Sequence, residues 1–101
     1  MTFQNIDVAQ FKDKMENKEV VILDVRTEAE VNEGCIPGHI MINFMSPFFA
    51  EQVDKLDKDT TYLVYCRSGG RSSKACEMMS KMGFQSLFNL EGGMMAWNIE
   101  N

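Results

Sequence analysis

The strongest constraint on the fold is the run Val20-Val21-Ile22-Leu23-Asp24-Val25, which is apolar at every position but one. A half-buried strand alternates apolar and polar side chains, so a nearly continuous apolar run predicts a strand that is covered on both faces. Thr61-Tyr62-Leu63-Val64-Tyr65 predicts another strong strand, because it is rich in β-branched and aromatic residues. Strands covered on both faces are typical of parallel sheets in α/β proteins.

The segments between these strands carry helix signals. Two capping-box pairs, three residues apart, are Asp7 with Gln10 and Thr27 with Glu30. Ser46-Pro47 predicts the start of a further helix. Apolar side chains at helical spacing, which we expect to face the core, are Val8, Phe11, Met15, Phe49, Val53 and Leu56.

Shorter strands are expected at residues 3–5, 40–44 and 86–89. Strands that alternate with helices imply a parallel sheet with helices on both sides. In such sheets, ligands bind beyond the carboxyl ends of the strands. The strand at 61–65 ends directly at Cys66, which is therefore expected at the ligand-binding edge.

The chain is acidic, with ten Lys and Arg against fifteen Asp and Glu residues and a formal charge of -5. Phosphate binding requires a basic surface, so nucleic acid is not expected as a partner. No apolar run approaches the roughly 20 residues that span a bilayer, and no signal-peptide pattern opens the chain. We expect one cytoplasmic domain over residues 1–101, without membrane contact.

The number and spacing of the cysteines predict neither a disulfide scaffold nor a metal site. The three are Cys35, Cys66 and Cys76. Their number is odd, no pair has Cys-x-x-Cys spacing, and the single histidine, His39, does not complete a ligand set. We therefore expect no metal and no cofactor.

Cys66 opens the glycine-rich turn Cys66-Arg67-Ser68-Gly69-Gly70-Arg71-Ser72. The N–H groups of such a turn, and of the helical turn that follows it, have no carbonyl partners of their own. Gly69 and Gly70 permit positive φ angles, so these donors can converge on an anion, either the thiolate or an incoming oxyanion. The alternative is that Cys66 is a small buried hydrophobic residue, which its polar neighbours disfavour.

A helix terminus alone does not ionise such a thiol. Lowering a thiol pKa by about 2 takes about 2.7 kcal/mol, whereas a helix N-terminus typically gives ~0.3–1 kcal/mol. Charge-assisted hydrogen bonds contribute about 1.5–3 kcal/mol each, so several N–H donors with Arg67 or Arg71 nearby can supply the rest. The turn predicts a thiolate at neutral pH in a positively lined pocket.

The helix that follows is expected to end at Gly83, and Cys76 is expected in the core beside its apolar face. Residues predicted on that apolar face are Ala75, Met78, Met79 and Met82. Residues of the final turn or helix that either cap the sheet or line the pocket rim are Met94, Met95 and Trp97.

Four segments together resemble the single-domain rhodaneses, the thiosulfate or persulfide sulfurtransferases. The turn at 66–72 resembles their active-site loop, and Leu23-Asp24-Val25-Arg26 is similar to their Asp-Val-Arg segment. Gly34-Cys35-Ile36-Pro37-Gly38-His39-Ile40 is similar to a Gly-His-Ile-Pro-Gly-Ala segment, and Leu90-Glu91-Gly92-Gly93 with Trp97 resembles the C-terminal signature. The four occur in the family's order over nearly the whole chain.

The resemblance implies an α/β fold with a five-stranded parallel sheet flanked by helices on both faces. It implies that Cys66 takes a sulfane sulfur from thiosulfate, a persulfide or a polysulfide, and passes it to cyanide or a thiol. A sulfur-relay protein is a further option as partner. Asp24 and Arg26 are expected to anchor the loop as an ion pair. By the same resemblance, the residues that bind the persulfide and the anionic donor are Arg67, Ser68, Gly69, Gly70, Arg71 and Ser72, with Arg71 the better placed arginine.

The chain departs from the family at two positions, with Cys35 where histidine is usual and His39 where alanine is usual. Cys35 can be a resolving thiol, which would give a Cys35–Cys66 disulfide on oxidation, or it can simply fill the histidine's space. The second role is the expected one. His39 is expected to be an ordinary surface histidine.

Two other functions are compatible with a reactive Cys66. A persulfide carrier or thiol sensor would need the same cysteine without turnover. A cysteine phosphatase or arsenate reductase has Cys-x5-Arg, whereas here Arg71 follows Cys66 after four residues. A loop one residue shorter makes a tighter cradle, which favours sulfur transfer over phosphoryl chemistry.

Overall fold

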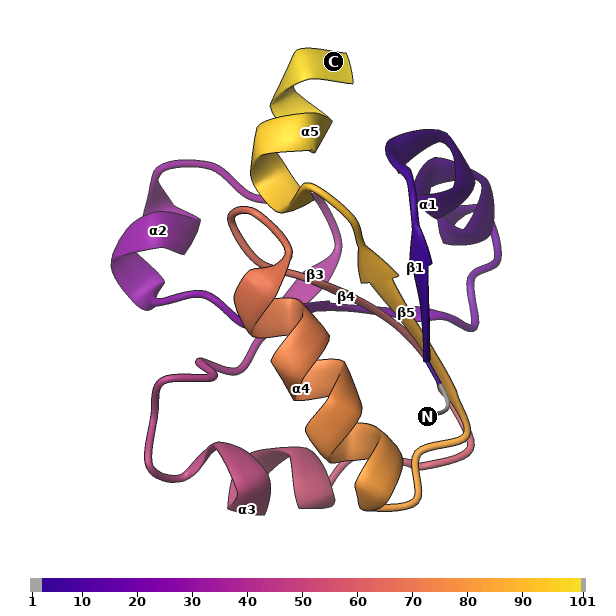
Figure 1. Ribbon diagram of the computed structural model, residues 1–101, viewed down its shortest axis with the longest axis vertical. Helices are drawn as coiled ribbons and strands as arrows, with labels where there is room; N and C mark the ends of the chain where they lie inside the picture. Colours follow the sequence, from indigo (N-terminus) through magenta and orange to yellow (C-terminus); the bar gives the residue numbers. More distant parts are fainter. Residues whose placement is uncertain (1–2, 101) are drawn as a thin grey trace.

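The computed structural model describes residues 3–100, so Met1, Thr2 and Asn101 of the expected domain lie outside the described residues. Strands and helices alternate along the described chain (Figure 1). The strands are β1 (Phe3–Ile6), β2 (Val21–Asp24), β3 (His39–Met41), β4 (Thr61–Tyr65) and β5 (Ser86–Leu90). The helices are α1 (Val8–Met15), α2 (Glu28–Asn32), α3 (Phe49–Asp54), α4 (Gly70–Lys81) and α5 (Gly93–Glu100).

The strands form one sheet in the order β1-β5-β4-β2-β3, in which every neighbouring pair is parallel. The predicted five-stranded parallel sheet is confirmed. β4 lies at its centre, and every residue of β2 and β4 after the first is buried. The apolar runs therefore form the covered strands that their composition predicts.

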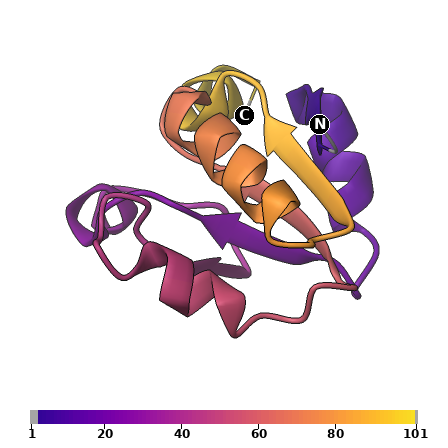
Figure 2. The same cartoon turned by 60° about the horizontal axis from the view of Figure 1, so that its bottom comes forward.

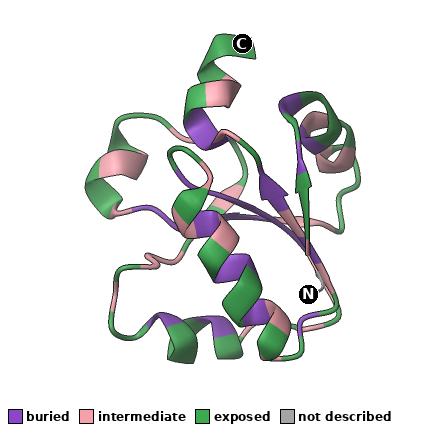
Figure 3. Ribbon diagram, in the orientation of Figure 1, coloured by how far each residue is buried: buried purple, intermediate pink, exposed green. Residues whose placement is uncertain are grey.

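Helices cover both faces of the sheet (Figures 1 and 2). Tyr62 and Val64 of β4 belong to a core with α3 and α4, whereas Leu63 and Tyr65 belong to a second core with α1 and α5. Successive strand residues thus supply opposite faces. Buried positions follow β2, β4 and β5 and the inward side of α4 (Figure 3). Among residues 3–100, no helix combines the length and hydropathy needed to cross a membrane.

Most of the local helix signals are confirmed. Both predicted capping boxes form, with Asp7 accepting from the Gln10 N–H at 2.8 Å and Thr27 accepting from the Glu30 N–H at 3.3 Å. α4 ends at Gly83, which has a φ of +102°. Its N–H donates to the Ser80 carbonyl, and the next N–H donates to the Met79 carbonyl, which is the Schellman pattern.

Two predicted boundaries are wrong. α3 begins at Phe49, not at Pro47 with Ser46 as its N-cap. The Ser46 side chain and carbonyl instead accept hydrogen bonds from the Phe48 and Phe49 N–H groups in a preceding turn. β3 covers His39–Met41, not residues 40–44. Its partner β2 ends at Asp24, so only isolated backbone hydrogen bonds continue beyond the strand.

The predicted apolar face of α4 is wrong at Met78, which is 37% exposed. The buried stripe consists of Ser72, Ala75, Cys76 and Met79, at the i, i+3, i+4, i+7 spacing of one helical face. Cys76 lies in the core, as predicted, and Met82 packs against the core in part.

The predicted Asp24–Arg26 ion pair is present and almost completely buried. Arg26 Nη2 lies 2.8 Å from Asp24 Oδ2, and the two side chains are 6% and 0% exposed. Arg26 Nη2 also donates to the Gly34 carbonyl at 2.7 Å. Next to it, the Tyr65 hydroxyl accepts from the Ile36 N–H at 3.0 Å. The pair thus fastens the segment at 34–36 to the carboxyl edge of the sheet.

We expect Arg26→Met to destabilise the protein strongly, because it leaves the Asp24 charge buried without a partner. Removing one member of a buried pair costs about 3–5 kcal/mol. Lys81→Met is the matched control, since Lys81 and Glu77 are exposed and 3.9 Å apart, and such pairs contribute about 0–1 kcal/mol. Urea unfolding measures both, and equal losses of stability in the two variants would contradict this account.

Candidate active site

Cys66 directly follows β4, the central strand, at the carboxyl edge of the sheet. The glycine-rich turn is shorter than predicted, because α4 already begins at Gly70. Gly69 has a φ of +103°, as expected, but Gly70 is not among the residues with positive φ, so this part of the prediction is wrong. Arg71 and Ser72 therefore belong to the first turn of α4, which holds them more rigidly than a loop would.

Hydrogen-bond donors surround the sulfur of Cys66. The Gly69 N–H lies 3.1 Å from Cys66 Sγ, and the Ser72 hydroxyl lies 3.3 Å from it. Cys66 is 1% exposed and Ser72 is fully buried, so little water competes with these donors. The turn and the first residues of α4 thus form the anion-binding cradle that the sequence predicts.

The cradle changes the acidity of the thiol. Burial raises the pKa of Cys66, but hydrogen bonds from the Ser72 hydroxyl and from the N–H groups of Ser72, Gly69 and Ser68 outweigh burial and lower the pKa below its ordinary value. Cys76 shows the opposite balance, because burial raises its pKa to about 12. Of these two buried thiols, only Cys66 is prepared to ionise.

The start of α5 fixes the direction of the turn's peptide groups. The Met94 N–H donates to the Cys66 carbonyl at 2.9 Å, and the Met95 N–H donates to the Arg67 carbonyl at 3.0 Å. The carbonyl and N–H of a trans peptide point in opposite directions. Holding these two carbonyls toward α5 therefore directs the N–H groups of Arg67 and Ser68 away from α5.

Gly93 allows this close approach. It has a φ of +54°, and a Cβ atom added there would lie 2.5 Å from the Cys66 carbonyl oxygen and 2.6 Å from the Arg67 carbonyl oxygen. Backbone atoms cannot move aside as a side-chain end can. Gly93 is thus a packing requirement of the site.

The two arginines of the turn have different surroundings. Arg71 forms two hydrogen bonds with Glu30 of α2, at 2.8 Å and 2.7 Å, and both side chains are about one-quarter exposed. The guanidinium is the largest cause that lowers the pKa of Glu30, to about 2. Arg67, by contrast, is exposed, and its side chain makes no hydrogen bond or ion pair within residues 3–100.

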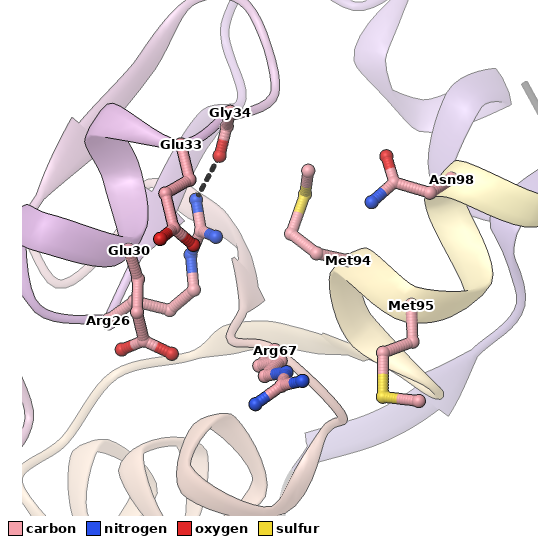
Figure 4. A pocket seen from close by; sticks show the side chains of 8 residues that line it. All are labelled: Arg26, Glu30, Glu33, Gly34, Arg67, Met94, Met95 and Asn98. Carbon is pink, nitrogen blue, oxygen red and sulfur yellow. Dashed lines mark hydrogen bonds between the residues drawn. The ribbon is translucent and has the colours of Figure 1, made fainter.

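A pocket of about 380 Å³ lies beside the turn (Figure 4). Its lining residues are Arg26, Glu30, Glu33, Gly34, Arg67, Met94, Met95 and Asn98. Figure 4 shows α2 with the following segment on one side, α5 on the other, and Arg67 of the turn between them. Cys66 does not line this pocket; its neighbour Arg67 does.

The sequence left two roles open for Met94, Met95 and Trp97, and the three residues do not share one role. Met94 and Met95 line the pocket. Trp97 instead packs edge-on against Phe11, with ring centroids 6.2 Å apart, and belongs to the core under α1 and α5. Glu33 and Asn98 were missed, because exposed polar residues near helix ends have no distinctive sequence signal. Only the packing of α2 opposite α5 places them together.

The other candidate residues lie apart from the cradle or remain untested. Cys35 is half-buried and is a free thiol, as are Cys66 and Cys76, so the predicted space-filling role and the alternative resolving role both remain untested. His39 lies in β3, where its Nδ1 is 3.0 Å from the Ile36 carbonyl oxygen. Among residues 3–100, no cluster of three His, Cys, Asp or Glu side chains is arranged to hold a metal ion.

We expect Ser72→Ala to shift the reactivity of Cys66 to higher pH, because the thiolate loses its side-chain donor and the pKa rises. At pH 7 the alkylation of Cys66 by iodoacetamide should slow by up to about tenfold, the factor for ~1.4 kcal/mol. Peptide mapping after a pH series measures the effect at Cys66 alone. Ser73→Ala is the control, since the Ser73 side chain makes no hydrogen bond to the sulfur, and an equal effect there would refute the assignment.

We expect Gly93→Ala to lower both the melting temperature and the alkylation rate of Cys66. A left-handed backbone costs a residue with a Cβ roughly 1–2 kcal/mol, and the contact with the Cys66 and Arg67 carbonyls adds to that. Gly70→Ala is the control, because nothing lies within 4 Å of its added Cβ. Calorimetry and alkylation kinetics test the pair. An unchanged Gly93→Ala protein would mean that the α5 contact does not shape the turn.

Comparison with known proteins agrees with the fold. The Rhodanese-like domain family matches residues 7–100. YtwF of Bacillus subtilis (strain 168) is 41% identical over 101 residues, which cover 99% of this chain and 95% of YtwF. Thiosulfate sulfurtransferase GlpE of Shewanella oneidensis is 30% identical over 100 residues, covering 99% of this chain and 97% of GlpE.

A solved structure shows the same architecture over almost the whole chain. The rhodanese-related protein of Thermoplasma volcanium superposes with a TM-score of 0.85 at 31% identity, and the match covers 97% of this chain and 93% of that one. Its strands and helices therefore follow the path described above. Together with the match to residues 7–100, this establishes that the chain belongs to the Rhodanese-like domain family.

Proposed function

We propose that this protein is a sulfurtransferase that carries a sulfane sulfur as a persulfide on Cys66. The observation that carries the proposal is the donor cradle around Cys66 Sγ, made by the Gly69 N–H and the Ser72 hydroxyl. The cradle stabilises a thiolate before the reaction and a persulfide anion after it. The partners on this proposal are small sulfur-containing anions and thiols, and a sulfur-relay protein is a further acceptor class.

The first half-reaction loads the enzyme. The Cys66 thiolate attacks the outer sulfur of thiosulfate, a new S–S bond forms, and the S–S bond of thiosulfate breaks. Sulfite leaves with the electron pair of the broken bond, and the negative charge of the enzyme moves to the outer sulfur of the persulfide. No proton or cofactor enters this balance. A persulfide or polysulfide donor reacts in the same way, with a thiolate or a shorter polysulfide leaving.

The second half-reaction removes the outer sulfur from the Cys66 persulfide. Cyanide attacks the outer sulfur and leaves as thiocyanate, which returns Cys66 as a thiolate. A thiolate acceptor takes the sulfur in the same manner and leaves as a persulfide. Arg67 can attract both anionic donors and anionic acceptors, because it is exposed on the wall of the adjacent pocket. The two half-reactions together form a double displacement at a single sulfur atom.

Phosphoryl transfer is less well supported. A phosphatase loop needs an arginine that is available to bind the tetrahedral oxyanion. Arg71 follows Cys66 after four residues, and both of its terminal nitrogens already bind the Glu30 carboxylate. This geometry ties α4 to α2 and leaves no free guanidinium at that position.

We expect thiosulfate to add one sulfur, about 32 Da, to the wild type and none to Cys66→Ser, because the donor cradle that stabilises a thiolate surrounds the sulfur of Cys66. Intact-protein mass spectrometry measures the addition, and a cyanide chase should remove it as thiocyanate. Cys35→Ser is the matched control and should load normally.

Loading of Cys66→Ser, or loss of loading in Cys35→Ser, would assign the sulfur to another thiol. A loaded protein that returns no thiocyanate would indicate a carrier or sensor. Absence of loading from thiosulfate and from polysulfide, with turnover of a phosphate ester, would overturn the sulfurtransferase proposal.

A further inference from the structure

The pocket beside Cys66 contains four charged residues, and they divide into two classes. Arg26 is held by buried Asp24, and Glu30 is held by Arg71, each through short hydrogen bonds. Glu33 and Arg67 are exposed, and neither side chain has a hydrogen bond or an ion pair within residues 3–100. The pocket therefore offers one carboxylate and one guanidinium for a ligand.

The position of Glu33 is not explained by helix stability. Glu33 is the C-cap residue of α2, where the helix dipole disfavours a negative charge. Its carboxylate does not close a capping box, as Glu30 does for the same helix. Figure 4 shows Glu33 on the α2 side of the pocket, with Arg67 on the turn between the two walls.

The size of the pocket exceeds that of an inorganic anion. Its volume is about 380 Å³, within the range of roughly 300–1,000 Å³ that is typical of sites for small organic ligands. Met94 and Met95 supply thioether and methylene surface on the α5 side, which suits a sulfur-containing carbon skeleton. Asn98 adds an amide on the same helix.

We propose that this pocket selects an aminothiol, a thiol whose carbon skeleton carries both an ammonium and a carboxylate group, as the sulfur acceptor. Arg67 binds the carboxylate, Glu33 binds the ammonium, and the two methionines contact the methylene carbons. The inference rests on the proposed sulfurtransferase function and names the acceptor class of the same site. Glu33 is then a specificity residue that cyanide and thiosulfate do not use.

The transfer is balanced without any further reactant. The acceptor thiolate attacks the outer sulfur of the Cys66 persulfide, a new S–S bond forms on the acceptor, and the persulfide S–S bond breaks. Cys66 leaves as a thiolate with that electron pair, and the acceptor leaves as an aminothiol persulfide. The cradle of Gly69 and Ser72 stabilises the leaving thiolate.

The test compares acceptors that differ by one charged group. Each protein is first loaded with sulfur from polysulfide, and loading is verified by intact mass. The discharge rate is then measured at low salt with cysteine, with 3-mercaptopropionate, which lacks the ammonium, with cysteamine, which lacks the carboxylate, and with cyanide. The discharge rate of each variant is divided by the wild-type rate with the same acceptor, so intrinsic differences between the thiols cancel.

We expect Glu33→Gln to slow discharge to cysteine and cysteamine by about fivefold, the effect of one partly exposed ion pair of ~1 kcal/mol. Discharge to 3-mercaptopropionate and cyanide should not change. Arg67→Gln should slow discharge to cysteine and 3-mercaptopropionate more than discharge to cysteamine. Glu28→Gln is the control for net charge, since Glu28 is exposed on the same helix outside the pocket lining.

Glutathione as an acceptor distinguishes an amino acid thiol from a peptide thiol, because its ammonium lies much farther from the sulfur than the ammonium of cysteine does. Sensitivity to Glu33→Gln with cysteine alone assigns the pocket to an amino acid thiol, and sensitivity with glutathione extends the assignment to peptide thiols. Equal rates for Glu33→Gln and Glu28→Gln with every acceptor would overturn the inference while leaving a loaded sulfurtransferase. Failure of the wild type to load would instead refute the proposed function.

Discussion

The active site depends on the two hydrogen bonds that α5 donates to the turn after β4. By holding the Cys66 and Arg67 carbonyls, the first N–H groups of α5 set the orientation of both peptide groups. The opposite ends of the turn's peptides are then available to an anion, and the pKa of Cys66 falls although the thiol is buried. Only glycine fits at position 93, since a Cβ there would collide with both carbonyls. The surroundings of the Cys66 sulfur therefore depend on α5, which follows much later in the chain but contacts the turn directly.

The parallel sheet brings the remaining parts to the same edge. Asp24 at the end of β2 holds Arg26, and Arg26 in turn holds the Gly34 carbonyl. Arg71 at the start of α4 holds Glu30 of α2. Both pairs stabilise the wall of the pocket opposite α5, and both remove their charges from use by a ligand. The charges that remain for a ligand are those of Glu33 and Arg67, and the proposed choice of acceptor rests on these two residues.

Much of the fold can be predicted from local sequence. Two capping boxes, the covered strands and the helix end at Gly83 all follow from short-range physical chemistry, and the structure confirms them. The predictions fail where a neighbouring element decides. Met78 is exposed because the stripe that contains Cys76 is the buried side of α4, and Gly70 is already the first residue of α4, without a positive φ. Neither choice is visible from composition or spacing.

The sequence by itself determined the α/β class and the family, and it predicted Cys66 as the reactive position, because strand composition, capping residues and the glycine-rich turn act over a few residues. Tertiary structure alone decided which arginine is free. Glu30 lies 41 positions from Arg71, and no short-range pattern in the sequence predicts that α2 packs beside α4. The same holds for Glu33 and Arg67, which share a pocket only because parallel strands end at one edge and place their following segments side by side.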